Sequence, residues 1–476
     1  MRLRFKSKKN EAVKSSEAYQ LERKRTDSNY LLVLPLWIVL IVLLVWGMVI
    51  LYSVSAATAV IDAQTKAIVP DAAFYVRKQL GFTCIGIIAA FLISRIPIDK
   101  FKKPFYMYVI MGGLLALLLA TRLFGVTHNG AKRWLNLGVE FQTSELLKVG
   151  SIVAYAIYRD WVIRTRAKSA EKNKKMSSPK MHFACVDFLI PVTILLVYDL
   201  IVLFQPHTSG FIIIGIIVFV CVLVSGLSFE TWIKGMLPYI LVGVMAIGVF
   251  LVLPENVGIK VKVNDYLHSH FEHVFTRLAL SSDDTTLSKD DTMQYDNAFA
   301  ALGSGGLKGV GIGNSRSKYH YVPEAHTDYI FAIYVEETGM IGGCILIALY
   351  MTMFWLCMRV ALRAKDIFSR IIAVGYTTMI MIEALLNISV NLQVTPPTGV
   401  SLPFVSYGGT AQVIFLCAYG MILCVARSGT KTPYDFDVAS DPEFADSEEY
   451  DETEDDTKTE EDVKPSAKNV KRKVHR

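Results

Sequence analysis

The chain has few charged residues and few cysteines for its 476 residues. Asp, Glu, Lys and Arg make up 19% of it, whereas 53% of its residues are hydrophobic, and the mean hydropathy is positive. This excludes an ordinary soluble protein, which at this length would form two or three domains. The seven cysteines lie within apolar runs and form no closely spaced pair in a polar loop. A disulfide framework and a zinc site are therefore excluded. The sequence also lacks a recognisable internal repeat.

Long apolar runs are what the sequence has instead. They reach the roughly 17 to 25 residues that cross a bilayer as a helix, and residues 31–52 contain no charge at all. This first run is too long for a signal-peptide core, so we expect it to be an uncleaved span. We predict an all-α, polytopic membrane protein with about ten transmembrane helices, near residues 31–52, 80–97, 105–124, 142–159, 184–204, 209–227, 232–253, 328–356, 370–392 and 407–427.

The distribution of Lys and Arg orients these spans. Both residue types concentrate in the first 25 residues and in the loops 95–103, 159–180 and 359–370. Basic loops stay in the cytoplasm, which places both termini inside and a large loop, 254–327, outside between spans seven and eight. The predicted parts are a basic cytoplasmic segment (1–30), the membrane domain (31–427) and a cytoplasmic tail (428–476).

The tail is acidic between Asp435 and Asp462 and basic from there to its end. Such a charge block cannot bury enough apolar surface to fold alone. We expect it to be disordered; the alternative is a docking segment for cytoplasmic partners.

The large loop ends in a glycine-rich stretch from Gly303 to Gly313. A nucleotide-binding fingerprint would need a βαβ unit around these glycines, whereas this stretch lies between membrane helices. We expect close backbone packing at the membrane surface instead. Earlier in the loop lie five potential metal ligands with no recognised spacing, which we interpret as hydrated surface: His268, His270, His273, Asp283 and Asp284.

Asp328 follows this loop, at the outer mouth of an apolar helix and directly after His326 and Thr327. One interpretation is an N-cap or first-turn acid that complements the helix dipole. The other is a functional carboxylate that faces a cavity at the membrane interface.

Two charges also lie inside the apolar run that begins near residue 142. Glu145 and Lys148 are three residues apart and therefore share a helix face. Ionisable groups within a span are costly and usually face a partner or a water-filled cavity, so they form either a structural ion pair or part of a site. Just before them, Arg133 suits a phosphate, and Trp134 suits the site or the aromatic belt of the interface.

A third outer stretch, Pro396 to Gly409, combines prolines, glycines and hydroxyl groups, including Ser406. Irregular backbone at membrane depth is tolerated where it is buried or lines a cavity. Three irregular polar stretches in one leaflet predict a single outward-facing site.

With these residues laid out, the chain resembles the SEDS family (shape, elongation, division and sporulation) over residues 30 to 427. Its FtsW-type members are more similar than its RodA-type members. Three stretches carry the resemblance: Asn129-Gly-Ala-Lys-Arg-Trp134 with Phe141-Gln-Thr-Ser-Glu-Leu-Leu-Lys148, Pro323-Glu-Ala-His-Thr-Asp-Tyr-Ile-Phe-Ala332 with Glu336-Glu337 and Gly339, and Leu402-Pro-Phe-Val-Ser-Tyr-Gly-Gly409. The chain departs from the family pattern at Thr143, His207, His320, Thr398 and between residues 280 and 295.

The resemblance implies a ten-helix peptidoglycan glycosyltransferase that polymerises lipid II in the bacterial plasma membrane, in septal synthesis by its FtsW-type likeness. It implies a class B penicillin-binding protein as partner; other divisome proteins could bind the tail, and no nucleic acid is involved. Asp328 matches the family's essential aspartate, and we expect it to be catalytic, with substrate or pyrophosphate bound by Arg133, Trp134, Glu145, Lys148, His326 and Ser406. A divalent cation (Mg²⁺ or Mn²⁺) is an open alternative for neutralising the pyrophosphate. A lipid II transporter (flippase) and a structural division scaffold are the rival functions.

Overall fold

The computed structural model describes residues 31–55, 59–61, 68–71, 73–128, 131–136, 138, 140–172, 184–205, 207–252, 289–319, 325–395 and 397–428. The predicted basic segment and charged tail lie outside these residues, as does much of the large loop. Their predicted character therefore stays a prediction.

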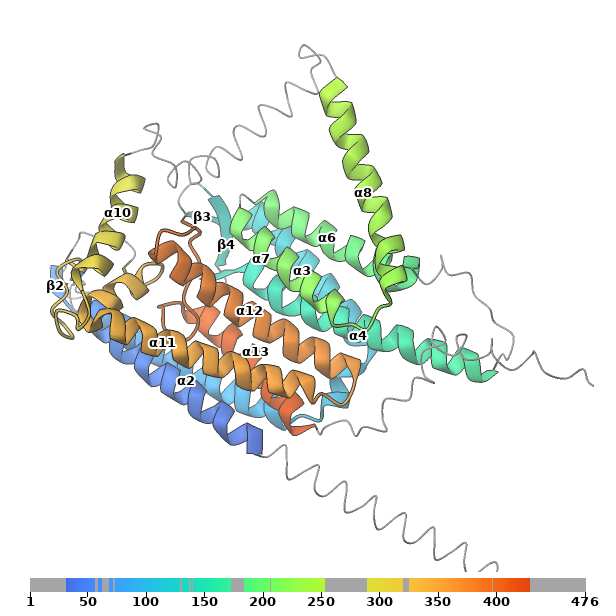
Figure 1. Cartoon of the computed structure of the whole chain (residues 1–476), viewed down its shortest axis with the longest axis horizontal. Coiled ribbons are helices and arrows are strands. Elements are labelled where there is room, and N and C mark those ends of the chain that lie inside the picture. Colours follow the sequence, from blue (N-terminus) through green and yellow to red (C-terminus); the bar gives the residue numbers. More distant parts are fainter. Residues whose placement is uncertain are drawn as a thin grey trace, which may run out of the picture.

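Each of the ten predicted spans coincides with a helical segment (Figure 1). These are a first helix, Leu31–Ser55, followed by α2 (Phe74–Arg95), α3 (Pro104–Phe124), α4 (Thr143–Lys172), the π-helix η2 (Cys185–Leu189) with α6 (Ile190–Leu203), α7 (Thr208–Leu223), α8 (Phe229–Val252), α11 (Ile330–Leu362), α12 (Ile367–Asn391) and α13 (Gly409–Arg427). Within the described residues, seven helical segments are long and apolar enough to cross a membrane, and α7 is a shorter apolar helix. The protein is thus a multi-pass membrane protein.

The prediction of an all-α fold was wrong in one respect, because two small antiparallel sheets join the helices. One pairs β1 (Ala59–Ile61) with β2 (Ile68–Pro70); the other has the order β3 (Val126–His128), β4 (Ala131–Asn136), β5 (Glu140–Gln142). Strands of only three to six residues are too short to produce an apolar run or an alternating pattern in the sequence. They form because a loop between helices must pair its backbone N–H and C=O groups. The β5 strand runs directly into α4 and so fixes where that helix begins.

α11 extends beyond the predicted span 328–356 and is not one continuous helix. Its 33 residues would extend about 50 Å, well beyond the roughly 30 Å of a hydrocarbon core. The helix breaks at Gly339, where φ is 74° and ψ is −178°. Residues 330–338 therefore form a separate half-helix after Asp328, and residues 340–362 make the long apolar segment.

Close packing against the glycine-rich loop causes this break, as the glycines predicted. A Cβ atom at Gly339 would lie 2.4 Å from the Leu307 carbonyl oxygen, and one at Gly309 would lie 2.2 Å from that of Glu337. The two backbones are also joined by hydrogen bonds, such as Met340 N–H to the Gly306 carbonyl at 2.9 Å. The loop itself is preceded by a helix that was not predicted, α10 (Lys289–Ser304).

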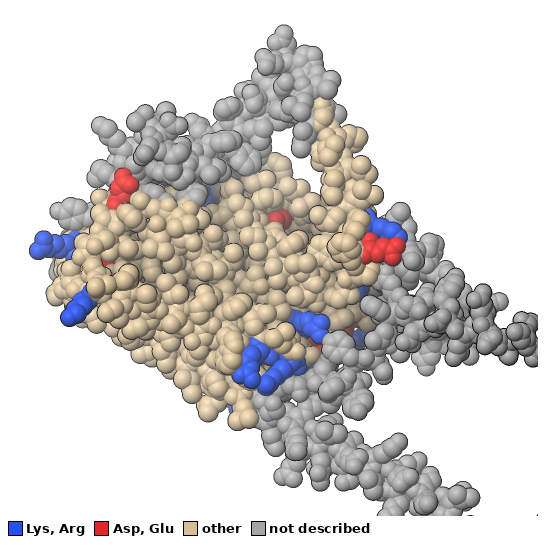
Figure 2. Space-filling view, viewed as in Figure 1, with Lys and Arg blue, Asp and Glu red and all other residues tan. Residues whose placement is uncertain are grey.

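α12 and α13 form the centre of the bundle, since most of their side chains are buried. α13 lies along α2 so closely that a Cβ atom at Gly420 would meet the Ala90 Cα atom at 2.7 Å. At the periphery, α8 leans away from the other helices (Figure 1). Charged side chains gather near the ends of the bundle and leave the broad face between them almost uncharged (Figure 2), as a lipid-facing surface requires.

Ion pairs hold the loops at the end of the bundle opposite to Asp328. Lys102, in the 3₁₀ helix η1 (Ile98–Lys102), binds Asp99 and Asp366, each at 2.6 Å. Asp366 is also the N-cap of α12, where its side chain accepts a hydrogen bond from Ser369 N–H. One lysine thereby joins the α2–α3 connection to the start of α12.

Candidate active site

Asp328 lies at the start of the half-helix, but it does not cap it. The N-cap is Tyr329, and no side chain satisfies the cap position, so Asp328 is not an N-cap, whereas an interaction of its carboxylate with the helix dipole stays a prediction. What α12 holds instead is the main chain of Asp328. The Asp328 carbonyl oxygen accepts hydrogen bonds from the side-chain amides of Asn387 at 2.8 Å and Asn391 at 3.0 Å.

The Asp328 side chain is half-buried and is directed at the third irregular stretch. A Cβ atom built at Gly399 would lie 3.6 Å from Asp328 Oδ2. Gly399 has a φ of +65°, a conformation that a residue without a side chain adopts at little cost. The carboxyl group therefore faces the irregular backbone around Gly399, which is itself exposed.

His326 and Ser406 belong to the same cluster. Ser406 Oγ donates to the Thr327 carbonyl oxygen at 2.6 Å, and Tyr407 N–H donates to that of His326 at 2.9 Å. The His326 ring stacks on Tyr75, with a centroid distance of 4.2 Å and an interplanar angle of 21°. The stretch that leads into Asp328 and the stretch that ends at Gly409 are thus joined beside Asp328, two of the three that were predicted to form one site.

Lys148 forms a buried ion cluster that is larger than the predicted pair. Its ammonium nitrogen lies 2.7 Å from Glu145 Oε1 and 2.5 Å from Glu383 Oε1. The Lys148 and Glu383 side chains are 2% and 1% exposed, so only Glu145, at 14%, remains partly open. Glu383 was not predicted, although it is the lone acid within the apolar run 370–392 and the rule that singled out Glu145 applies to it equally.

One face of α12 connects the two clusters. Glu383, Asn387 and Asn391 are spaced four residues apart and therefore share that face, with a rise of about 6 Å between successive members. The first binds Lys148 and the other two bind the Asp328 carbonyl. The candidate cation and the candidate base are consequently positioned by the same helix.

Arg133 and Trp134 lie half-buried in β4, in the sheet that leads into α4. Trp134 pairs with Gln142 of β5. The Gln142 amide nitrogen lies 3.3 Å from His207 Nε2, and two residues further Ser209 Oγ donates to the Thr398 carbonyl at 2.9 Å. A series of contacts thus joins the sheet to the stretch that faces Asp328.

Comparison with known proteins identifies the family of this chain. The family model FTSW_RODA_SPOVE, described as "Cell cycle protein", matches residues 34–431. The chain belongs to this family.

Relatives of this FTSW_RODA_SPOVE member include sporulation and cell-wall proteins. Stage V sporulation protein E of Bacillus subtilis (strain 168) is 29% identical over 85% of this chain and 98% of that protein. A probable peptidoglycan glycosyltransferase FtsW of Enterococcus hirae is 32% identical over 68% of this chain and 75% of its own.

Solved structures share the fold. A chain from a study of polymerisation and crosslinking by a peptidoglycan synthase complex superimposes with a TM-score of 0.58 at 24% identity, covering 82% of this chain and 96% of that one. The rod shape determining protein RodA of Thermus thermophilus gives a TM-score of 0.50 at 23% identity, covering 82% and 95%.

The part of the chain that the structure describes contains no set of side chains that could coordinate a metal ion by itself. No three His, Cys, Asp or Glu side chains converge anywhere within it, and in the Lys148 cluster an ammonium group already lies between the two carboxylates. The five loop residues that raised the question of a metal are outside the described part of the chain. A divalent cation (Mg²⁺ or Mn²⁺) that neutralises the pyrophosphate therefore stays a prediction.

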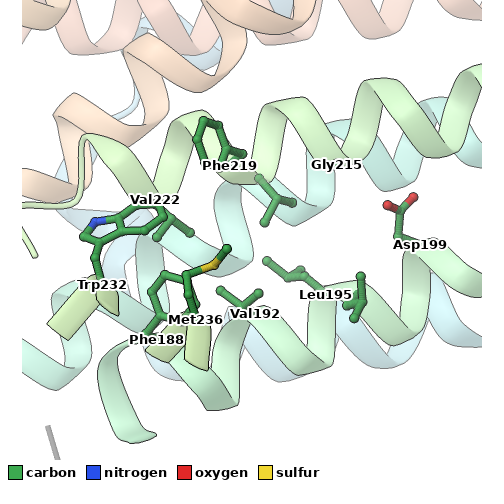
Figure 3. Close-up of a pocket in the computed structure, with 11 residues that line it drawn as sticks. Phe188, Val192, Leu195, Asp199, Gly215, Phe219, Val222, Trp232 and Met236 are labelled. Carbon is green, nitrogen blue, oxygen red and sulfur yellow. The ribbon is translucent and has the colours of Figure 1, made fainter. Parts of the chain in front are cut away.

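A cavity of about 140 Å³ lies elsewhere, between α6, α7 and α8 (Figure 3). Its walls are apolar apart from Asp199, and its lining includes none of the predicted site residues. Asp199 is 3% exposed, and its Oδ1 has no hydrogen-bond partner within the described structure. It offers a buried acid that is separate from the candidate site.

Proposed function

We propose that this protein is a peptidoglycan glycosyltransferase that polymerises lipid II at the outer face of the bacterial plasma membrane. The observation that carries the proposal is that Asp328 lies beside Ser406 and His326. The face of α12 that binds the Asp328 main chain also binds the buried Lys148 ammonium through Glu383. The names of its relatives support the reaction class, since several are probable peptidoglycan glycosyltransferases.

The reaction joins an acceptor sugar hydroxyl to the anomeric carbon of a donor held on a lipid pyrophosphate. The hydroxyl is a poor nucleophile, so a carboxylate must accept its proton as the new carbon–oxygen bond forms. Asp328 takes this role. The bond from the anomeric carbon to the pyrophosphate oxygen breaks, and the departing negative charge requires fixed positive charge nearby.

Arg133 supplies most of that charge, because the Lys148 ammonium already pairs with two carboxylates. Lys148, Trp134, His326 and Ser406 shape the site around the saccharide and its pyrophosphate. Glu145 and Glu383 hold the Lys148 ammonium in place. Because lipid anchors keep both substrates in one leaflet, much of the orientational entropy is removed before reaction. No nucleotide is required, since the sugar arrives activated on its carrier.

The membrane arrangement completes the proposal. The proposed topology has ten spans and both termini in the cytoplasm, so that Asp328 and the glycine-rich loop lie outside, where lipid-linked donor and acceptor meet. A class B penicillin-binding protein is the proposed partner, and the likeness to a chain studied as part of a peptidoglycan synthase complex supports it. Septal synthesis during division, with divisome proteins at the tail, is the proposed setting.

Asp328→Ala tests the proposal in purified protein, combined with a class B penicillin-binding protein and lipid II in detergent. We expect the loss of a general base to reduce polymerisation by about 10²- to 10⁴-fold while membrane insertion stays normal. Asp199→Asn is the matched control, because it alters a buried acid outside the site, and it should retain activity. Full glycan synthesis by Asp328→Ala would overturn the assignment.

One observation favours the transporter alternative. Transporters often use helices that are broken near a binding site, and α11 is broken at Gly339. Liposomes that contain the protein separate the two functions: translocation of lipid II without polymer would favour a transporter, and glycan chains the enzyme.

A further inference from the structure

Asn387 joins two segments that are far apart in the sequence. Its side-chain amide nitrogen donates to the Asp328 carbonyl and to the Val400 carbonyl, each at 2.8 Å. An Asn side chain has two N–H donors, so both are used. One buried amide therefore fixes the segment that carries Asp328 against the segment that its carboxyl group faces.

Asn391 supports the same segment one turn further along α12. Its amide nitrogen donates to the Asp328 carbonyl at 3.0 Å and to the Asn387 carbonyl at 2.8 Å, and its side-chain oxygen accepts from Ala332 N–H at 3.0 Å. Both asparagines are 1% exposed. A buried amide is costly unless its hydrogen bonds are made, so the pair is matched to this one arrangement of the backbone.

α12 is deeply buried, and one turn before Asn387 it carries Glu383, the partner of Lys148. The spacing between the Asp328 main chain and the Lys148 ammonium group is thus set by one helix rather than by the loops. Base and cation must act on opposite sides of one anomeric carbon. An error of about 1 Å in such a spacing can reduce a rate 100-fold.

We propose that Asn387, assisted by Asn391, is a positioning residue that holds Asp328 in register with the Lys148 cluster during glycan polymerisation. This inference rests on the proposed function. It assigns Asn387 no contact with substrate, so its loss should reduce kcat far more than it changes KM.

The test compares Asn387→Leu and Asn387→Asp with wild type in the lipid II assay. Leucine has a similar volume and no donors, which suits a membrane helix, and aspartate keeps the shape but loses the amide. We expect both to reduce kcat by about 10- to 100-fold. Thr377→Val is the matched control, because Thr377 lies on the same helix and is 2% exposed. The variant loses hydrogen bonds with the Ala373 carbonyl and the Cys357 side chain, neither of which belongs to the site. It should keep kcat within about twofold of wild type.

A double variant separates positioning from a general effect on folding. If Asn387 acts through Asp328, Asp328→Ala with Asn387→Leu should be no slower per folded molecule than Asp328→Ala alone. A kcat of Asn387→Leu near wild type, with Asp328→Ala inactive, would overturn this inference and leave the proposed function intact. An equal reduction in kcat by Thr377→Val would also overturn it. Activity of Asp328→Ala would instead remove the proposed function, and this inference with it.

Discussion

Replacing Lys148 by methionine should destabilise the protein strongly, because it leaves two carboxylates together in the bundle. The Lys148 ammonium lies 2.7 Å from Glu145 and 2.5 Å from Glu383. At an effective dielectric constant of about 20, each pair attracts by roughly 6 kcal/mol, before the cost of removing three charges from water is subtracted. Removing one partner of a buried ion pair costs about 3–5 kcal/mol, which is the loss we expect for Lys148→Met.

Unfolding of the purified protein by SDS, followed by tryptophan fluorescence, measures this loss. Lys234→Met is the control, because Lys234 pairs with Glu230 at an exposed position and should contribute less than about 1 kcal/mol. Neutralising all three members with Lys148→Met, Glu145→Gln and Glu383→Gln should recover most of the stability, since no uncompensated charge stays buried. The reasoning is refuted if Lys148→Met is as stable as the control, or if the triple variant is less stable than Lys148→Met.

Two further predictions concern the loops. Gly309→Ala should lower the free energy of unfolding by about 2 kcal/mol or more, because its Cβ atom would meet the Glu337 carbonyl at 2.2 Å. Gly306 also has a positive φ but has nothing within 4 Å of such an atom, so Gly306→Ala should lower it by only about 1–2 kcal/mol. Equal losses in an SDS titration would contradict this. The second concerns pH: burial raises the pKa of Asp366, but hydrogen bonds from Lys102 and Ser369 outweigh it and lower that pKa below 3.8. The stabilisation of the fold by the ionised Asp366 carboxylate is therefore present above about pH 4 and is lost as pH falls through the pKa of Asp366 in the folded protein. The difference in melting temperature between wild type and Lys102→Met should accordingly be constant near neutral pH and narrow below pH 4, and an unchanged difference at pH 3 would be inconsistent with this linkage.

The positions of the spans could be predicted because burial in lipid requires long apolar runs, and each run became a helix. Two features could not be predicted this way. The sheet that contains Arg133 consists of strands too short to form a periodic pattern. The break at Gly339 depends on contact with Gly309, and nothing in either local sequence indicates that the two backbones meet.

Within the site, the charged residues were predictable and the amides were not. Glu145 and Lys148 were found because a charge in a span is costly, and the same rule applied to the run 370–392 would have found Glu383. Asn387 and Asn391 cost less to bury and carry no charge, so they gave no comparable signal. Their function depends on contacts with a carbonyl group 59 and 63 residues away, which periodicity along one chain cannot reveal.

The contacts around Asp328 separate its chemistry from its contribution to the fold. Asn387 and Asn391 bind the main-chain carbonyl of Asp328, and every residue type supplies that group. Asp328→Ala can therefore keep the hydrogen bonds that join the half-helix to α12 while it removes the carboxylate. Changes at Asn387 or Glu383 break contacts that also stabilise the centre of the bundle, so their effects on activity must be normalised to folded protein. The Asp328 side chain can therefore be replaced without breaking the hydrogen bonds to α12, whereas replacing Asn387 or Glu383 breaks contacts within the bundle.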